Sequence, residues 1–177
     1  MAISIAVSGQ GYGDEGAFDY RAEMTGHIVI KPKDGKEFLE LLAQLSRTLG
    51  PINIIKVFSH SYKRGIILTN WSGFYDEPGP EDTGRAAYVS DLAAKVQSGE
   101  IVFAPNPQIL LFGCNQDGNF SEKLSAAIRG TVIASKGGSY PEIRGNRETG
   151  VFISTMRWEV YINGAFSHSA GTRLRAW

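Results

Sequence analysis

The segment Gln108-Ile-Leu-Leu-Phe-Gly-Cys-Asn115 is an apolar run that stops at the only cysteine of the chain. A matching run, Ile52-Asn-Ile-Ile-Lys-Val-Phe-Ser-His60, stops in the same way at one of only three histidines. Short apolar runs bounded by polar residues are typical of strands that are covered on both faces. The sequence therefore predicts two core strands, each of which ends at one half of a thiol–imidazole pair.

Apolar residues elsewhere recur at helical spacing, which predicts helices between the strands. The clearest case begins after Asp34, a plausible N-cap, and ends at Gly50-Pro51. Two further helices are predicted from residue 82 or 83 to about residue 97, and over 120–129. Strand–helix–strand units with short connections build a parallel sheet with right-handed crossovers.

Other apolar segments predict shorter strands, over residues 3–7, 26–30, 65–69, 101–103 and 131–135. Pro105 and Pro107 are expected to separate the strand at 101–103 from the run that ends at the cysteine. Partial alternation over 151–162, followed by Asn163-Gly164, predicts a hairpin with a return strand in 165–166 and 174–177. The predicted fold is a single α/β domain over residues 1–177: three layers, α/β/α, around a mostly parallel central sheet, plus this C-terminal β-hairpin.

Two segments are predicted as surface loops. Gly9-Gln-Gly-Tyr-Gly13 follows a strand, but the acidic residues after it would repel a phosphate, and neither Lys-Ser/Thr nor a helical pattern follows. A surface loop is therefore preferred over a nucleotide-binding loop. Residues 70–84 are rich in Gly, Pro and acidic residues, and their aromatic side chains either pack on the protein body or line a cleft.

The composition excludes several classes of protein. Eighteen basic and eighteen acidic residues cancel, so there is no basic footprint for nucleic acid or an anionic membrane. No apolar run is long enough to span a membrane, and the N-terminus does not resemble a signal peptide. One cysteine allows no intrachain disulfide, which favours the cytoplasm, or export without a cleavable signal peptide or oxidative folding. The few His and Cys residues are too scattered for a zinc site, and no cofactor is predicted.

The two strand ends also predict where chemistry would occur. In an open parallel sheet, ligands bind at the carboxyl ends of the strands, which is where His60, Cys114 and the loop 136–139 are expected. A thiol is mostly protonated at neutral pH, and a nearby imidazole can remove its proton and later protonate a leaving amine. A lone cysteine is, however, more often a small buried apolar residue, so a structural role stays open.

The residues Val57-Phe-Ser-His60-Ser61 and Ile109-Leu-Leu-Phe-Gly113-Cys114 resemble the two strand ends of the caspase-like cysteine peptidases. This group includes caspases, gingipains, clostripain, legumain and the self-cleaving protease domains of large bacterial toxins. The spacing of 54 residues between His60 and Cys114 is close to the value of about 50 in caspases. The resemblance covers roughly residues 26–140, because residues 126–134 also resemble the helix and strand that follow the cysteine in the toxin-type members.

The resemblance implies that Cys114 is the nucleophile and His60 the general acid–base. It also implies that the backbone N–H groups of Cys114 and Ser61 form an oxyanion hole beside Gly113, which would let substrate approach closely. Two departures point to a distant bacterial-type member rather than a true caspase. Ser61 stands where the family usually has Gly, and Phe-Gly-Cys-Asn-Gln replaces Gln-Ala-Cys-x-Gly. The predicted substrate cleft adds Lys136, Gly137, Ser139 and Trp71.

Two functions therefore stay open. The first is a cysteine endopeptidase that cleaves a peptide or protein substrate through a thioester intermediate. The second is a non-catalytic binding or effector module with Cys114 in its core. A serine hydrolase is not favoured, because no Gly-x-Ser-x-Gly motif occurs. Four acidic residues could form an acidic pocket for a basic side chain, and two arginines could form a basic one, but ordinary surface charge is the preferred interpretation of both sets. The residues are Asp76, Glu77, Asp117 and Glu142, and Arg144 and Arg147.

Overall fold

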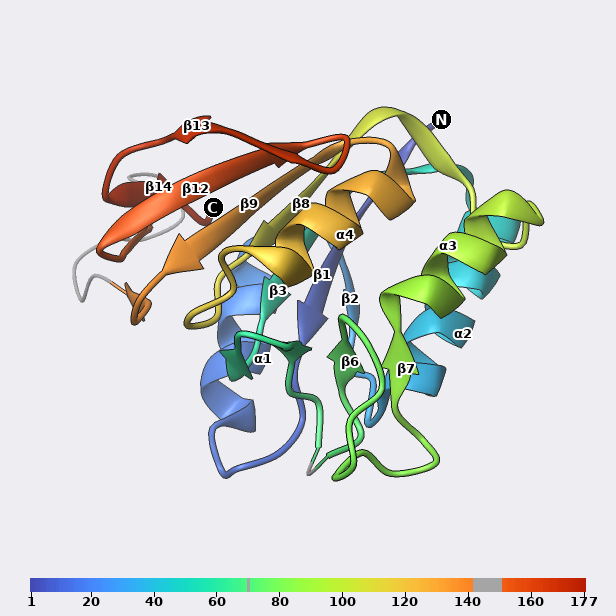
Figure 1. The fold of residues 1–177 in the computed structure, drawn as a ribbon, viewed down its shortest axis with the longest axis horizontal. Helices are drawn as coiled ribbons and strands as arrows, with labels where there is room; N and C mark the ends of the chain where they lie inside the picture. Colours follow the sequence, from blue (N-terminus) through green and yellow to red (C-terminus); the bar gives the residue numbers. More distant parts are fainter. Residues whose placement is uncertain (70, 142–150) are drawn as a thin grey trace.

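The computed structural model describes residues 1–69, 71–141 and 151–177, and its main element is a seven-stranded sheet in the order β13-β12-β9-β8-β3-β1-β2 (Figure 1). Five strands are parallel: β1 (Ile3–Ser8), β2 (Ile28–Ile30), β3 (Ile52–Phe58), β8 (Phe103–Leu111) and β9 (Thr131–Lys136). β12 (Arg157–Ile162) lies antiparallel to β9 and forms the predicted hairpin with β13 (Ala165–Ser169). The α/β class, the mostly parallel sheet and the hairpin are thus as predicted.

Helices cover both faces of this sheet. One core cluster contains side chains from α2 (Gly35–Thr48), α3 (Val89–Gln97) and α4 (Asn119–Ile128), and the other contains side chains from α1 (Glu15–Met24) (Figure 1). Successive residues of a strand point to opposite faces, so Ile109 and Leu111 of β8 enter the first cluster and Leu110 enters the second. Each such fully buried side chain stabilises the fold by roughly 1.5–3 kcal/mol.

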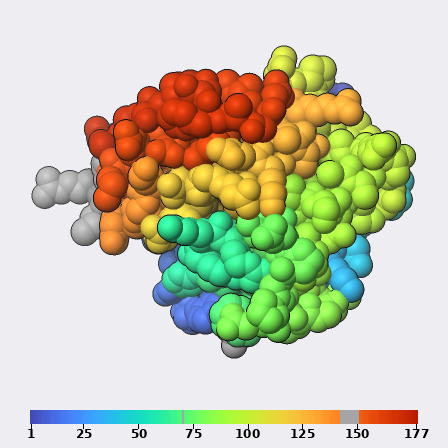
Figure 2. Space-filling model, in the orientation of Figure 1, coloured from blue at the N-terminus to red at the C-terminus, as the bar shows by residue number. Residues whose placement is uncertain are grey.

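Two small sheets lie beside the main one. The first consists of β4 (Ser61–Tyr62), β5 (Gly65–Ile66), β6 (Phe74–Tyr75) and β7 (Ala87–Tyr88). It begins directly after β3, so it lies at the carboxyl end of the parallel strands, in the lower part of Figure 1. Figure 2 shows the teal and green segments next to each other in the lower half of the same face. The second consists of β10 (Tyr140–Pro141), β11 (Phe152–Ser154) and β14 (Arg173–Arg175).

Helix α1 is the largest departure from the sequence prediction, which placed no helical pattern after the glycine-rich loop. Only Phe18 and Ala22 of this helix are buried, so it carries no apolar stripe that periodicity could detect. The prediction that 70–84 forms only a surface loop is also wrong for Phe74 and Tyr75, which form strand β6. Both side chains are buried, which is the packing on the protein body that the sequence left open. Tertiary packing, rather than local pattern, decides both elements.

Smaller corrections concern where elements begin and end. α3 begins at Val89 rather than at residue 82 or 83, and the strand predicted over 65–69 is confined to Gly65–Ile66. The two prolines do not separate two strands; they lie within β8, where the register shifts between Ile52↔Phe103 and Ile54↔Gln108. A register shift accommodates prolines that cannot donate to a regular ladder. The predicted return strand is divided between β13 and β14, which pair in different sheets.

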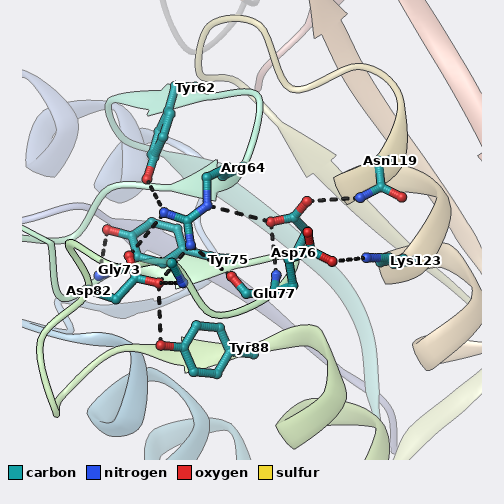
Figure 3. A network of polar contacts seen from close by, with 11 residues as sticks. Tyr62, Arg64, Gly73, Tyr75, Asp76, Glu77, Asp82, Tyr88, Asn119 and Lys123 are labelled. Atoms are coloured by element: carbon teal, nitrogen blue, oxygen red, sulfur yellow. Dashed lines mark hydrogen bonds and ion pairs between the residues drawn. The ribbon is translucent and has the colours of Figure 1, made fainter.

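An ion-pair network holds the segment between β6 and β7 against its neighbours (Figure 3). The Arg64 guanidinium donates two hydrogen bonds to the carboxylate of Asp82, at 2.6 and 3.0 Å, and lies 5.0 Å from the ring centroid of Tyr75. From α4, Asn119 donates to Asp76 and Lys123 pairs with Glu77, at 2.8 and 3.0 Å (Figure 3). These two acidic residues are thus engaged in contacts between elements.

The other charged residues considered for a pocket are placed differently. Asp117 lies in the turn before α4, and Glu142, Arg144 and Arg147 lie outside the described residues. Within the described ranges, no helix is both long enough and apolar enough to cross a membrane.

The Arg64–Asp82 pair generates a prediction about acid stability. Burial alone would raise the pKa of Asp82, but hydrogen bonds from Arg64 and from the Gly79 N–H outweigh it and hold the pKa below its usual value. Since the Asp82 side chain is 2% exposed, Asp82→Ala should lower the free energy of unfolding by roughly 3 kcal/mol at pH 7. A depressed pKa stabilises the folded state above the unfolded pKa of about 3.9, and this contribution is lost as the pH falls through the folded value.

Urea unfolding of both proteins between pH 7 and pH 2.5 measures this effect. The difference in the free energy of unfolding between wild type and Asp82→Ala should have its largest value at pH 7 and should shrink below about pH 4. The matched control is Glu100→Gln, which removes the exposed partner of Lys95 and should leave stability unchanged at pH 7. A difference that is independent of pH would contradict the assignment.

Candidate functional site

The carboxyl ends of β1, β3 and β8 meet at one edge of the sheet (Figure 1). The parallel strands follow the order β2-β1-β3-β8-β9, so the connections that leave β1 and β3 run in opposite directions along the sheet. A crevice forms at such a switch point, and ligands bind there in open α/β sheets. His60 and Cys114, which follow β3 and β8, line a single cavity of about 210 Å³ at this edge.

His60 is held by a residue that follows β1. Its ring Nε2 lies 2.7 Å from the Oδ2 of Asp14, and the ring of Phe18 meets it edge-on at 5.1 Å. Asp14 is the N-cap of α1, where an aspartate commonly accepts a hydrogen bond from the first turn, yet its side chain makes no such cap. The carboxylate is bonded to Nε2 of the histidine instead. This contact fixes the position of the ring and occupies Nε2, so Nδ1 is the ring nitrogen that remains for a second contact.

Cys114 is half-buried in a turn that is tied to the end of β9. Its Sγ accepts a hydrogen bond from the Ser139 N–H at 3.3 Å. The next two residues, Asn115 and Gln116, donate their N–H groups to the carbonyls of Gly137 and Ser135, at 2.9 and 3.0 Å. The sulfur therefore has a fixed backbone and one N–H donor, which would stabilise a thiolate.

Ser61 and Gly113 pack against each other beside the cysteine. The Ser61 hydroxyl donates to the Cys114 carbonyl at 2.7 Å, which links the ends of β3 and β8. A Cβ at Gly113 would collide with the Ser61 side chain and would lie 2.8 Å from the Oε1 of Gln116. Packing against Ser61 and Gln116 thus explains why a glycine stands at position 113. The sequence prediction had instead explained this glycine by the close approach of substrate.

The cavity also contains polar groups that no protein partner satisfies. Among the described residues, the hydroxyls of Ser59 and Ser139 are buried without a hydrogen-bond partner, and both residues line the cavity. Arg21 of α1 lines it too, and burial lowers the pKa of its guanidinium, while the charge of Asp14 opposes that shift. Buried polar groups are rarely left unsatisfied, so a ligand or water is expected to bind here.

The remaining residues predicted for the cleft are distributed over separate places. Ser139 lines the cavity, but Lys136 and Gly137 are not among its lining residues. The Nζ of Lys136 lies 3.6 Å from Oε1 of Glu159, and the Gly137 carbonyl accepts the hydrogen bond from Asn115. Trp71 lines a different hollow. The cavity therefore brings together His60, Gly113, Cys114 and Ser139, whereas Lys136, Gly137 and Trp71 do not line it.

Sequence reasoning missed Asp14 and Arg21, because it missed the helix that carries them. An aspartate after a glycine-rich loop is itself an N-cap signal, and it could have indicated a helix start at this position. No local signal, however, indicates that the Asp14 carboxylate bonds a histidine 46 residues away. No group of three or more His, Cys, Asp or Glu residues suited to a metal ion occurs in the part of the chain that the structure describes.

Comparisons with models of protein families, with curated proteins and with solved structures find no match for this chain. The caspase-like assignment therefore stays a prediction, based on the two strand ends that meet at the cavity.

The packing of Gly113 generates a prediction about stability. Gly113→Ala should lower the free energy of unfolding by roughly 1–3 kcal/mol, because the new methyl group must displace Ser61 or Gln116. The control is Gly16→Ala, whose Cβ would meet nothing within 4 Å in helix α1 and should stabilise by about 0.4–1 kcal/mol. Thermal unfolding of both variants and the wild type measures these two changes in stability. If Gly113→Ala were as stable as the wild type, Ser61 and Gln116 would be able to move aside without cost, and the prediction would be wrong.

Proposed function

We propose that this chain is a caspase-like cysteine endopeptidase with a three-layer α/β/α fold, in which Cys114 is the nucleophile and His60 the general acid–base. One observation carries the proposal: His60 and Cys114 follow the carboxyl ends of the neighbouring parallel strands β3 and β8, and both residues line the same cavity at the switch point of the sheet. The exposed fraction of the His60 side chain, 41%, leaves it accessible to a substrate.

The first step is attack of the Cys114 sulfur on the carbonyl carbon of the scissile peptide bond. His60 takes the thiol proton, and the N–H of Ser139 stabilises the thiolate that results. Between the described residues, no hydrogen bond joins the Cys114 sulfur to the His60 ring. The two groups must therefore approach each other in the substrate complex, where catalytic hydrogen bonds tighten.

The tetrahedral intermediate needs donors for its oxyanion, and two backbone N–H groups support this role. The N–H of Cys114 makes no hydrogen bond to any described residue. Ser61 lies opposite Ile66, and the His60 carbonyl accepts from the Ile67 N–H at 2.9 Å. Ser61 thus occupies a non-hydrogen-bonded position of the antiparallel ladder, and its N–H is directed away from β5.

Collapse of the intermediate breaks the carbon–nitrogen bond and leaves the acyl group on the sulfur as a thioester. His60 gives its proton to the departing amine. It then takes a proton from the water that attacks the thioester, and returns that proton to the sulfur as the acid product leaves. Asp14 accepts from Nε2 throughout, so that Nδ1 carries the transferred proton.

A binding or effector module that keeps the same fold is the second candidate. It is favoured by the resting contacts, because the ring of His60 is bonded to Asp14 and the sulfur of Cys114 accepts from Ser139, and the two residues are not bonded to each other. In this case the unsatisfied hydroxyls of Ser59 and Ser139 would bind a ligand without chemistry.

A peptide that carries a thiol-directed electrophile distinguishes the two candidates. Cys114 of the wild type should be labelled much faster than Cys114 of His60→Ala, since the imidazole generates the thiolate. Cys114→Ala and His60→Ala should each remove nearly all cleavage of a peptide library, and the double variant should be little worse, because members of one catalytic unit are non-additive. Equal labelling of wild type and His60→Ala in folded protein would refute the peptidase and leave the binding module.

The Asp14–His60 contact makes a separate prediction about positioning. Asp14→Asn should lower kcat by roughly 10- to 100-fold with little change in KM, less than the 10⁴-fold typical of a buried orienting carboxylate, because Asp14 is 57% exposed. Asp14→Glu should recover part of the loss. Glu23→Gln, which makes the same charge change at the other end of α1, is the control and should leave kcat unchanged. An unchanged kcat in Asp14→Asn would remove this residue from the mechanism.

A further inference from the structure

Four aromatic residues gather around a second hollow, separate from the cavity that contains Cys114. The hollow has a volume of about 90 Å³ and is lined by Tyr12, Tyr62, Trp71 and Tyr75 together with Ile67. Tyr75 is buried and forms its base, with its ring edge-on to that of Tyr62 at 5.8 Å. We refer to these five residues as the aromatic hollow.

Two of these aromatic residues have an unusual backbone conformation. Tyr12 and Trp71 have φ angles of 64° and 56°, in the left-handed region that bulky side chains rarely adopt. Burial of the side chains does not compensate for this backbone strain, since the two residues are 58% and 43% exposed. Strained backbone persists where the surroundings hold it, and it clusters at ligand-binding positions. The Thr83 N–H donates to the Trp71 carbonyl at 2.8 Å and helps to hold that residue.

The aromatic hollow is continuous with the candidate catalytic site. Tyr12 and Ile67 also line a neighbouring depression of about 410 Å³, whose other lining residues are Asp14, His60 and Ser61. The ring of Tyr12 meets that of His60 edge-on at 5.9 Å. An extended peptide that reaches the cavity from this side would therefore pass over Tyr12 and present a side chain to the hollow.

The charge beside the hollow selects the kind of side chain. Among the residues that the structure describes, no ionisable group other than the tyrosine hydroxyls lines it. The Arg64 guanidinium already lies 5.0 Å from the ring centroid of Tyr75 and donates to the Tyr62 hydroxyl at 3.4 Å. That guanidinium is paired with Asp82 and already covers one face of Tyr75, so this face cannot also stack on a second cation. The described lining residues include no carboxylate, so a lysine or arginine side chain would lose its hydration without gaining an ion pair. A neutral aromatic ring gains area burial and edge-to-face contacts with the four rings.

We propose that the aromatic hollow is a specificity subsite that binds an aromatic side chain of the peptide substrate on the His60 side of the scissile bond. This inference rests on the proposed function for its ligand, a peptide, but not on turnover. Binding to a catalytically inactive variant therefore tests it directly.

The experiment uses the full chain with Cys114→Ala and a set of blocked hexapeptides in an Ala/Ser background. One position at a time carries Phe, Ala or Lys, and binding is measured by calorimetry. At one position of the hexapeptide, the peptide with Phe should bind about tenfold more tightly than the peptide with Ala. The peptide with Lys at that position should bind no more tightly than the peptide with Ala.

The decisive variant adds Trp71→Gly to Cys114→Ala. Glycine adopts a positive φ without strain, so the fold should be kept while the ring is removed, and the preference for Phe should disappear. The control is Tyr20→Ala, which removes an exposed aromatic ring elsewhere and should keep the preference. A preference for Phe that survives Trp71→Gly, the absence of any preference, or tightest binding of Lys would each overturn the proposal.

Wild-type cleavage of the same peptides separates this proposal from the peptidase itself. Selective binding of Phe by Cys114→Ala, with no cleavage by the wild type, would support the subsite and refute the peptidase. Cleavage that is equally fast for Phe and Ala peptides, and unaffected by Trp71→Gly, would refute the subsite and support the peptidase.

Discussion

The parallel pairing of β3 with β8 is the constraint on which the candidate site depends. Val57 lies opposite Leu111, and the Phe112 N–H continues the ladder to the Val57 carbonyl at 2.9 Å. Because the strands are parallel and adjacent, their carboxyl ends coincide, and the residues that follow them are brought to one edge. A parallel pair requires a long crossover, and residues 59–102 supply it with a small sheet and α3.

Side-chain bonds between neighbouring turns then restrict the loops at this edge. Ser61 is bonded to the carbonyl of Cys114, the Ser135 hydroxyl to the carbonyl of Gly113, and Asp14 to His60. Each bond joins segments that belong to or follow different strands, so the loops at this edge are linked to one another and to β9. Such cross-links hold functional groups on loops nearly as firmly as groups on strands, which is what a site for chemistry or for specific binding requires.

The same segment that covers this edge combines a stabilising network with an open surface. The Arg64–Asp82 pair fixes the β4–β5 turn from one side, and the cation also covers one face of Tyr75. The base of the aromatic hollow is therefore rigid, whereas Tyr12 and Trp71 at its margin are exposed and strained. A rigid base with exposed aromatic walls is typical of a surface that binds a ligand rather than one that only completes a core.

The sequence by itself determined the elements whose apolar residues keep a regular period over a sufficient length. Helices α2 and α4, strands β3 and β9, the apolar part of β8 and the turn at Asn163-Gly164 all follow from local pattern, because burial of one face or both requires it. The same pattern placed a histidine and a cysteine at two strand ends. Only the tertiary structure decided that these strands are neighbours, that a helix with just two buried residues follows β1, and that its Asp14 reaches His60. These contacts join residues dozens of positions apart, and they form because the chain closes around a common core. A short window of sequence contains one partner of such a contact but not the other. The burial of Phe74 and Tyr75 was decided in the same way.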